Sequence, residues 1–549
     1  MPPNMTDYER TSREFRLEVP ERFNFARDVI GRWARDENRL AMHWVGADGA
    51  ERRHSFRYFA ERSDRVAALL RDSGVGKGDR VMVQLARVPA WWEVLLGIMK
   101  VGAVAVPGST LLTARDIAFR TSSAEGVAYI TDPEGAGKVD QVRSELPSLR
   151  TRVIVEGERD GWIPYHDGLE RAGSSPQTED TRSDDACLIY FTSGTVGYPK
   201  MVLHTHASYP IGHIITGRFW LDLGPSDLHW NLSETGWAKA AWSNFFGPWN
   251  QGAALFIQDS RGKFDPASTL ALLQEYPITT FCAPPTAYRM LVQERLSGVR
   301  TRLRHCVGAG EPLNPEVIAA WQSGLGMTIR DGYGQTETVL VCGNFPPLAV
   351  RPGSMGRPSP TFELSVIDDD GRELAPGAEG DIAIRVRPRR PIGLFREYWR
   401  NPEGTARSYR GDWYVTGDRA VRDEDGYFWF VSRADDVILS AGYRIGPFEV
   451  ESALVEHPAV QEAAAVGSPD PVRGEIVKAF VILSRGHQPS AALKRELQEH
   501  VKAVTAPYKY PREIEFVTEL PKTISGKIRR VELRERERAA RPAASRAPA

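Results

Sequence analysis

The feature that most constrains the fold of this chain is an apolar run that leads directly into a loop of hydroxyl groups, glycines and a lysine. The run, residues 186–191, reads Ala-Cys-Leu-Ile-Tyr-Phe and predicts a buried strand. The loop contains Thr192, Ser193, Gly194, Thr195, Val196, Gly197, Tyr198, Pro199 and Lys200. Glycines let backbone N–H groups approach an anion, hydroxyls donate hydrogen bonds, and the lysine adds positive charge. The segment predicts a polyphosphate-binding loop, although an ordinary surface turn has a similar composition.

This loop differs from that of the P-loop nucleotide-binding proteins. Pro199 precedes the lysine, and the G-x-x-x-x-G-K-[ST] spacing is absent. A different nucleotide-binding fold is therefore expected, and the case for it depends on motifs further along the chain.

The first half of the chain alternates helical and strand patterns. Helices are predicted at residues 59–72 and 90–101, and strands at 80–85, 103–107, 127–130 and 153–155. This alternation is typical of an α/β fold with parallel strands. At about 150 residues per domain, a length of 549 residues predicts three to four domain-sized units.

The pattern changes twice in the second half. After residue 362, short strands separated by Asp/Gly turns predict a small β-rich subdomain. After residue 432, helices and strands predict a compact α+β domain of about a hundred residues. The predicted organisation is an N-terminal domain of layered α/β subdomains over residues 1–432, a C-terminal domain over 433–538, and a disordered tail over 539–549.

Composition excludes several classes of function. A formal net charge of −1 gives no reason to expect a nucleic-acid partner. The cysteines contain no C-x-x-C pair, which argues against a zinc site and favours buried free thiols: Cys187, Cys282, Cys306 and Cys342. The N-terminus lacks the apolar core of a signal peptide, and the longest apolar stretch, near residues 94–106, is interrupted by Lys100. These features predict a cytoplasmic protein without a membrane span.

Four further segments, in a fixed order after the phosphate loop, identify a family resemblance. They are residues 331–338 (Asp-Gly-Tyr-Gly-Gln-Thr-Glu-Thr), 414–418 (Tyr-Val-Thr-Gly-Asp), 433–445 with the run Ser-Ala-Gly-Tyr-Arg, and 521–529 (Pro-Lys-Thr-Ile-Ser-Gly-Lys-Ile-Arg). Over roughly residues 40–535 the chain resembles the adenylate-forming superfamily of acyl-CoA synthetases, luciferases and peptide-synthetase adenylation domains. The amino-acid sequence of residues 333–340 and 470–480 is most similar to that of the medium-chain acyl-CoA synthetases.

The resemblance implies ATP, Mg2+ and CoA as ligands and assigns a role to each motif. The loop over Thr192–Lys200 would bind the β- and γ-phosphates, and Thr336 the α-phosphate. Glu337 would be the Mg2+ ligand, and Asp418 and Arg433 would contact the ribose. Two segments would hold the adenine end: Gly310, Glu311 and Pro312, and Asp331, Gly332, Tyr333, Gly334 and Gln335.

The remaining implied roles fall in the C-terminal domain. Lys527 would bridge the acid and the α-phosphate during adenylation. The segment Ala441, Gly442 and Tyr443 would line the pantetheine tunnel, and Arg473 would meet CoA phosphates. In the family this domain rotates about a hinge, which Asp435 matches here, so that the two segments act in turn.

The function that the resemblance implies is ATP-dependent ligation of a medium-chain, branched or aromatic carboxylic acid to CoA through an acyl-adenylate, with release of AMP and pyrophosphate. The sequence leaves the identity of this small-molecule acid open. Acetyl-CoA synthetases tend to have a tryptophan where Gly334 stands, and a glycine predicts room for a longer, branched or aromatic acid. Four tryptophans are expected either in the core or in the acid pocket: Trp230, Trp237, Trp242 and Trp249.

Two alternative functions stay open from the sequence: loading of a carrier-protein thiol, and nucleotide binding without catalysis. A homo-oligomer is possible. His204 and His206 have the spacing of a metal pair but are expected to pack or face solvent, because no third ligand lies nearby. The charged run over residues 534–541 is expected to be a solvated helix end.

Overall fold

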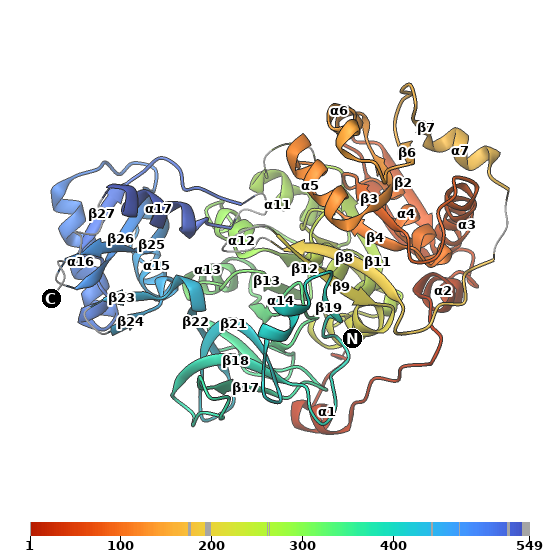
Figure 1. Cartoon of the computed structure of the whole chain (residues 1–549). Helices are drawn as coiled ribbons and strands as arrows, with labels where there is room; N and C mark the ends of the chain where they lie inside the picture. Colours follow the sequence, from red (N-terminus) through yellow and green to blue (C-terminus); the bar gives the residue numbers. More distant parts are fainter. Residues whose placement is uncertain are drawn as a thin grey trace.

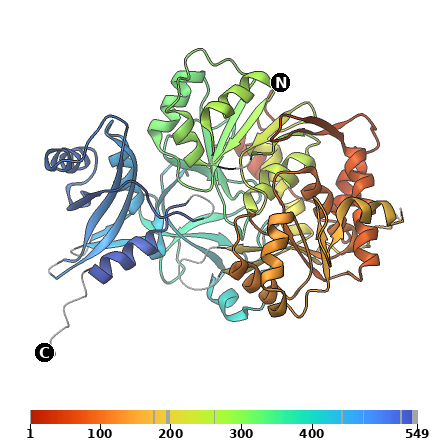
Figure 2. The ribbon, with the colours of Figure 1, turned by 90° about the horizontal axis from the view of Figure 1, so that it is seen from above.

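The computed structural model describes residues 2–173, 177–192, 199–260, 262, 264–440, 443–471, 473–523 and 527–540. Figure 1 shows a large body and a smaller lobe formed by the C-terminal part of the chain. Seen from above, in Figure 2, this lobe lies at the side of the body opposite the N-terminal α/β layer.

The first sheet confirms the predicted parallel α/β layer. Its strand order is β19 (Glu397–Tyr398), β9 (Lys200–Thr205), β8 (Ala186–Thr192), β4 (Val104–Pro107), β3 (Arg80–Gln84), β5 (Gly126–Thr131), β6 (Thr151–Ile154) and β7 (Ile163–Pro164). The strands from β8 to β7 run parallel, whereas β8 and β9 form an antiparallel pair around the phosphate-loop segment.

The helices beside this sheet have clear local causes. They are α3 (Phe56–Asp72), α4 (Pro89–Val101), α5 (Ala114–Ala124) and α6 (Pro133–Gln141). Gly102, at φ +73°, ends α4 in the left-handed conformation that glycine adopts readily. Thr113 and Asp116 begin α5 with a capping box. A Cβ atom on Gly97 would lie 2.4 Å from Val66 Cγ1, so this glycine permits the close packing of α4 on α3.

The second sheet joins the other α/β layer to the β-rich subdomain. Its order is β17 (Leu364–Ile367), β18 (Glu379–Arg385), β21 (Trp413–Arg422), β22 (Phe428–Arg433), β16 (Ser354–Pro358), β15 (Cys342–Gly343), β14 (Ile329–Tyr333), β13 (His305–Ala309), β12 (Thr280–Ala283), β10 (Leu228–Asn231), β11 (Ala254–Gln258), β1 (Leu40–Val45) and β2 (Glu51–Ser55), with β20 (Tyr409–Arg410) beside β21. Strands β14, β21 and β22, which carry three of the sequence motifs, therefore belong to one sheet.

Shorter helices connect and cover these sheets. They are α1 (Tyr8–Glu14), η1 (Ala26–Ile30), α2 (Gly31–Trp33), η2 (Arg143–Glu145), α7 (Tyr165–Arg171), η3 (Ala207–Ile211), α8 (His213–Ile215), η4 (Thr216–Trp220), α9 (Ala238–Ala241), η5 (Trp242–Phe246), α10 (Gly247–Asn250), α11 (Pro266–Glu275), α12 (Pro285–Leu291), α13 (Pro315–Leu325), α14 (Pro402–Arg407) and η6 (Ala434–Asp436). None of the helices in the described ranges is long and apolar enough to cross a membrane.

The C-terminal lobe is the expected α+β unit. Its sheet has the order β24 (Tyr443–Ile445), β23 (Ile438–Ser440), β26 (Gly474–Leu483) and β25 (Val460–Asp470), with β27 (Glu513–Phe516) beside β26. Its helices are α15 (Pro447–Val455), α16 (Ala491–Val504), η7 (Pro507–Lys509) and α17 (Arg530–Ala540). Ser490 begins α16 as predicted, because its hydroxyl accepts a hydrogen bond from the N–H of Leu493.

Helix α17 differs from the solvated helix end expected from its charges. Glu537 is buried; one carboxylate oxygen lies 2.7 Å from Lys478 Nζ and the other accepts from the Ser468 hydroxyl at 2.8 Å. The helix is therefore attached to β25 and β26 by charged groups on its inner face. It also includes Ala539 and Ala540, which the sequence assigned to the tail, and residues 541–549 lie outside the described ranges.

All four cysteines are buried free thiols, as the sequence predicted. Trp230, Trp242 and Trp249 are buried, and Trp242 and Trp249 belong to one hydrophobic cluster. Trp230 packs on Phe256 and Phe281 in the core, and Trp249 packs on Phe59 and Phe245. Trp242 also lies beside the motif on β14.

We predict that Glu537→Gln destabilises the folded chain. The substitution leaves the partly buried Lys478 ammonium with one carboxylate partner, Glu515 at 2.9 Å, in place of two. Removing one partner of a buried pair typically costs about 3–5 kcal/mol, and the surviving partner reduces the expected loss to about 2 kcal/mol. Denaturant unfolding measures the change. Glu535→Gln, on the exposed face of the same helix, is the control, and an equal effect of both substitutions would contradict the role assigned to Glu537.

Candidate active site

A carboxylate on β21 contacts side chains from the adjacent strand β22 and from the end of β14. Asp418 Oδ2 accepts hydrogen bonds from the Tyr333 hydroxyl at 2.7 Å and from Gln335 Nε2 at 2.6 Å. Its other oxygen lies 3.6 Å from Arg433 Nε, because Asp418 and Arg433 are directly opposed on β21 and β22. Burial and the adjacent carboxylate raise the pKa of Tyr333 well above its usual value, so the phenol stays a donor. The arrangement leaves an oriented, buried carboxylate that can accept hydrogen bonds from hydroxyl groups.

A second carboxylate, Glu337, lies close to the phosphate-loop hairpin. Tyr398 donates a hydrogen bond to Glu337 Oε1 at 2.8 Å, and Lys200 Nζ lies 4.7 Å from the centroid of the Tyr398 ring. Enclosure by protein raises the pKa of Glu337, although part of the side chain is accessible to water. Lys200 and Arg433 oppose this rise by their positive charge. Tyr398 was not predicted from the sequence, since it belongs to none of the motifs.

Two aromatic side chains form hydrogen bonds with the backbone of Thr336. Its carbonyl oxygen lies 2.8 Å from His204 Nε2 and 3.2 Å from the Tyr209 hydroxyl. Burial lowers the pKa of His204 to about 3 and that of His206 to about 4, so both rings are neutral near pH 7. Of the two expected alternatives, packing and solvent exposure, both histidines follow the first, since both are buried, and His204 also supports the motif loop.

The segment after β13 contributes a third acidic group. Glu311 accepts from the Thr286 hydroxyl at 3.0 Å and from Arg289 Nη2 at 2.9 Å. Gly310 precedes it at φ +108°, a backbone conformation that favours glycine. Lys239 donates a hydrogen bond to the Ala309 carbonyl, and burial lowers its pKa. The sequence motifs did not predict this lysine.

Two residues of the β14 motif have structural roles within the sheet. Burial raises the pKa of Asp331 to about 8, and the N–H of Gly332 donates to its carboxyl at 2.9 Å. A Cβ atom on Gly332 would lie 2.6 Å from the Trp220 ring. These two residues fix the position of Tyr333 at the end of the strand, and Tyr333 makes the hydrogen bond to Asp418.

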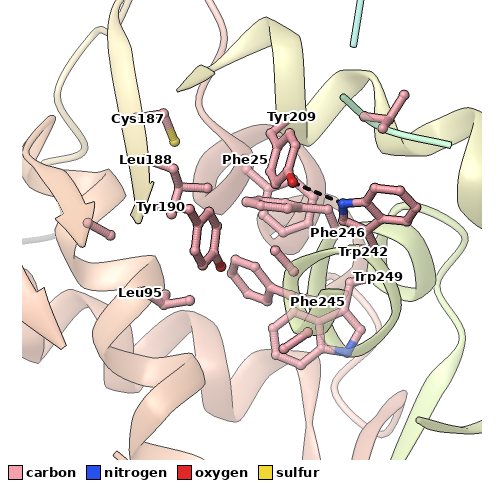
Figure 3. Close-up of a cluster of buried hydrophobic side chains, with 14 of the residues drawn as sticks. Phe25, Leu95, Cys187, Leu188, Tyr190, Tyr209, Trp242, Phe245, Phe246 and Trp249 are labelled. Atoms are coloured by element: carbon pink, nitrogen blue, oxygen red, sulfur yellow. Dashed lines mark hydrogen bonds between the residues drawn. The ribbon is translucent and has the colours of Figure 1, made fainter. Parts of the chain in front are cut away.

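The space beside Gly334 is occupied, which corrects the expectation that this glycine opens the acid pocket. A Cβ atom on Gly334 would lie 2.3 Å from Cη2 of Trp242 and 2.5 Å from the Val339 carbonyl oxygen. Figure 3 shows Trp242 within a cluster of buried aromatic rings, where its indole N–H donates to the Tyr209 hydroxyl at 2.9 Å. The volume beside Gly334 is thus filled by a tryptophan from a different element, η5.

Lys527, from the last sequence motif, lies within electrostatic range of these acidic groups. The charges that act on its ammonium are Glu311 and Asp418, which attract it, and Arg433 and Lys239, which repel it. Surrounding protein lowers its pKa below 10.5, while the side chain stays accessible to water. The lysine is therefore exposed to water while it stays within the electrostatic range of both carboxylates.

Two of the residues predicted to serve CoA, Tyr443 and Arg473, lie on exposed surface. The Tyr443 ring stacks on Tyr508 with centroids 4.3 Å apart, and Tyr443 is 51 % exposed. Arg473 is exposed beside Gly474, which pairs with Ser440. Ala441 and Gly442 lie outside the described residues.

The phosphate-loop prediction is only partly visible. Thr192 and Lys200 are opposed across the β8–β9 hairpin, which places the lysine at the base of the loop. Pro199 is described between them, whereas Ser193, Gly194, Thr195, Val196, Gly197 and Tyr198 lie outside the described residues. Pro312 follows Glu311 in the segment after β13.

Comparisons with known proteins agree with this arrangement. The family model described as AMP-binding enzyme matches residues 31–399, and the model described as AMP-binding enzyme C-terminal domain matches residues 449–527. The chain is 50% identical over 548 residues to human mitochondrial acyl-coenzyme A synthetase ACSM3, covering 98% of this chain and 93% of the relative. It is 47% identical over 534 residues to mouse mitochondrial acyl-coenzyme A synthetase ACSM5, covering 95% and 92%.

Solved structures of CoA ligases are also similar to this chain. The anthranilate CoA ligase AuaEII in complex with anthranoyl-AMP is similar with a TM-score of 0.87 and 32% identity, covering 95% of this chain and 98% of that one. A benzoate CoA ligase from Burkholderia xenovorans LB400 has a TM-score of 0.83 and 28% identity, covering 93% and 100%.

The expected cytoplasmic location is wrong by these comparisons, because the relatives are named as mitochondrial proteins. The N-terminal segment lacks the apolar core of a secretory signal, but this absence is compatible with more than one compartment inside the cell. The family matches, in contrast, confirm the resemblance drawn from the motifs: the chain belongs to the AMP-binding enzyme family, as an AMP-forming acyl-CoA synthetase.

Proposed function

We propose that this chain joins a compact carboxylic acid to CoA in two steps on one site. A carboxylate is a poor electrophile, so its oxygen first attacks the α-phosphorus of ATP and releases pyrophosphate. The CoA sulfur then attacks the carbonyl carbon, AMP leaves, and the thiol proton passes to solvent. The protein must align the reactants and offset the charge that develops as pyrophosphate departs.

The proximity of Lys527 to Asp418 and Glu311 carries this proposal. Asp418 is oriented to accept hydrogen bonds from the ribose hydroxyls, with Arg433 beside it. Lys527 approaches from the other lobe and would donate to both the acid and the α-phosphate. In this assignment Thr336 contacts the α-phosphate through its side chain while His204 holds its carbonyl.

The residues present fit a magnesium ion bound together with ATP. Mg2+ prefers oxygen and is commonly held by one or two carboxylates together with substrate phosphates. Glu337 is such a carboxylate, and it lies next to Lys200 at the base of the phosphate-loop hairpin. When bound there, the ion would offset negative charge on the phosphates, while Tyr398 orients the carboxylate toward it.

Trp242 determines the acid class in this proposal. Its ring fills the volume beside Gly334, so an extended acyl chain cannot take that path. A branched or aromatic acid needs less depth than a straight chain of the same mass. The similarity to ligases named for anthranilate and benzoate supports the same class.

The division of labour between the lobes completes the proposal. Tyr443 and Arg473, together with Ala441 and Gly442, would serve CoA after a rotation about Asp435, with the domain boundary at residues 432/433. Pyrophosphate release from a panel of acids, with and without CoA, separates this function from carrier-protein loading and from nucleotide binding without catalysis.

We predict that Lys527→Ala separates the two steps. Loss of one well-placed electrostatic donor typically lowers a rate by about 10²–10³-fold. Acid-dependent ATP–pyrophosphate exchange should fall by this factor, whereas thioester formation from a supplied acyl-adenylate should change by about 2-fold or less. Equal loss in both assays would contradict the assignment, and Lys522→Ala, a lysine of the same loop that pairs with Glu462 at 2.8 Å, is the control.

We predict that the need for Mg2+ depends on pH through Glu337. Its raised pKa means that protons compete with the metal at a higher pH than for an ordinary glutamate. As the pH falls through this pKa, the Mg2+ concentration for half-maximal pyrophosphate release should rise. Tyr398→Phe removes a hydrogen bond that lowers the pKa of Glu337. The rise in the required Mg2+ concentration should therefore begin at a higher pH in this variant. A pH-independent Mg2+ requirement in both proteins would rule out Glu337 as the ligand.

We predict that Trp242→Leu shifts preference toward longer straight acids. Each additional buried methylene contributes about 0.8 kcal/mol, so two of them should raise kcat/KM for a longer acid about 10-fold relative to a branched one. Trp249→Leu is the matched control, since it removes a tryptophan of the same aromatic cluster that packs on Phe59 and Phe245. The ratio of kcat/KM values decides the outcome, and the same ratio in wild type and both variants would refute the role of Trp242.

A further inference from the structure

Four buried or half-buried charged side chains form a closed cluster in the C-terminal lobe. Arg530 binds both oxygens of Glu451, with Nε 2.9 Å from Oε1 and Nη2 2.6 Å from Oε2. Arg530 Nη1 also lies 3.7 Å from Asp436 Oδ2, and Arg534 Nη1 donates to Asp436 Oδ1. The two arginines are four residues apart on α17 and therefore share one face of the helix. Two positive and two negative groups thus balance each other.

This cluster, which we call the α17 clamp (Asp436, Glu451, Arg530 and Arg534), is largely removed from water. The side chains of Asp436 and Glu451 are 9% and 8% exposed. Glu451 Oε1 accepts a further hydrogen bond from the N–H of Ala465 on β25 at 2.8 Å. Ion pairs of this kind are often no more stabilising than apolar residues, so their value lies in a defined geometry. A bidentate guanidinium–carboxylate contact defines both distance and orientation.

One end of the clamp meets the loop that carries Lys527. Arg530 follows Lys527 by three residues and is the first residue of α17. The two arms of the loop are joined by backbone hydrogen bonds from Thr523 to Lys527 at 2.7 Å and from Arg529 to Pro521 at 2.8 Å. The position of Arg530 therefore fixes where the segment that carries Lys527 joins the start of α17.

The other end of the clamp meets the linker between the lobes. Asp436 is the last residue of η6, directly after Asp435, the position that matches the family hinge. Arg433, at the start of the same short segment, lies beside Asp418 in the candidate active site. The linker therefore has one anchor in the nucleotide site, through Arg433, and one on α17, through Asp436.

We infer that the α17 clamp is a positioning device that holds the Lys527 loop in a set orientation relative to the linker. Rotation of the lobe then delivers the ammonium to one place, because loop and linker move as a unit. This inference rests on the proposed function of Lys527 in adenylation. Arg530 touches no reactant in this scheme and acts through the lysine. The contacts described for the clamp do not involve Tyr443 or Arg473, so the thioester step should change much less than adenylation when the clamp is broken.

The test uses the full chain and measures the two steps separately. In Arg530→Gln, acid-dependent ATP–pyrophosphate exchange should fall by about 10–100-fold, since a displacement of about 1 Å costs about 10²-fold in rate. Its kcat should fall while KM for ATP stays within about 2-fold, and thioester formation from a supplied acyl-adenylate should also stay within about 2-fold. Arg530→Lys, which keeps the charge but not the bidentate contact, should recover only part of the exchange rate.

Arg529→Gln is the matched control. Arg529 is the preceding residue of the same loop, and its exposed guanidinium pairs with Glu532 at 2.9 Å. It should leave both steps unchanged. Arg534→Gln, which removes one contact of the clamp, repeats the test if Arg530→Gln is recovered unfolded, as judged by thermal unfolding.

Two results would overturn the inference. One is an exchange rate in the clamp variants equal to that of wild type, and the other is a loss that is equal in both steps, which indicates a general structural role. A wild-type protein that is inactive in both assays would instead overturn the proposed function, so the two failures are distinguishable.

Discussion

The hydrogen-bonded carboxylate of Asp418 is the interaction on which the candidate site depends. It connects β14, β21 and β22, because Tyr333 and Gln335 donate to it from one side and Arg433 lies on the other. Leaving such donors unpaired in a buried setting costs about 1–3 kcal/mol each, so the three strands are constrained to one arrangement. The same arrangement places Arg433 at the start of the linker. The candidate site and the connection between the lobes therefore share one carboxylate.

Much of the fold follows from local patterns in the sequence. The helix predicted at 90–101 and its stop at a glycine correspond to α4 and Gly102, because apolar periodicity and a left-handed cap act within a few residues. The motifs also identified Asp418, Glu337 and Lys527 as a set. Tyr398 and Lys239 escaped prediction, since each joins the site only through long-range folding and neither has a distinctive neighbour in the chain. Trp242 shows the limit most clearly: Gly334 indicates an open volume until a ring from another element is placed in it.

Charge on α17 shows why polarity alone is a poor guide to exposure. The run around residues 534–541 has the composition of a solvated helix end, yet Glu537 and Arg534 point into the lobe. Their partners, Lys478 and Asp436, lie far away in sequence. Burial of such groups is tolerated because each is paired and hydrogen-bonded, and the pairs specify where the helix begins. A long-range partner of this kind leaves no local signal.

The lobe that carries Lys527 also carries Tyr443 and Arg473, and this geometry argues for alternation. Lys527 faces Glu311 and Asp418 in the body, while Tyr443 is stacked on Tyr508 on exposed surface. Both surfaces have assigned roles on the same acyl group in the proposed function, yet only one of them faces the nucleotide site in this arrangement. A fixed lobe would complete the adenylation site and leave CoA without its pantetheine segment. Rotation at the linker resolves the conflict, and it requires the lysine loop to move as a rigid part of the lobe.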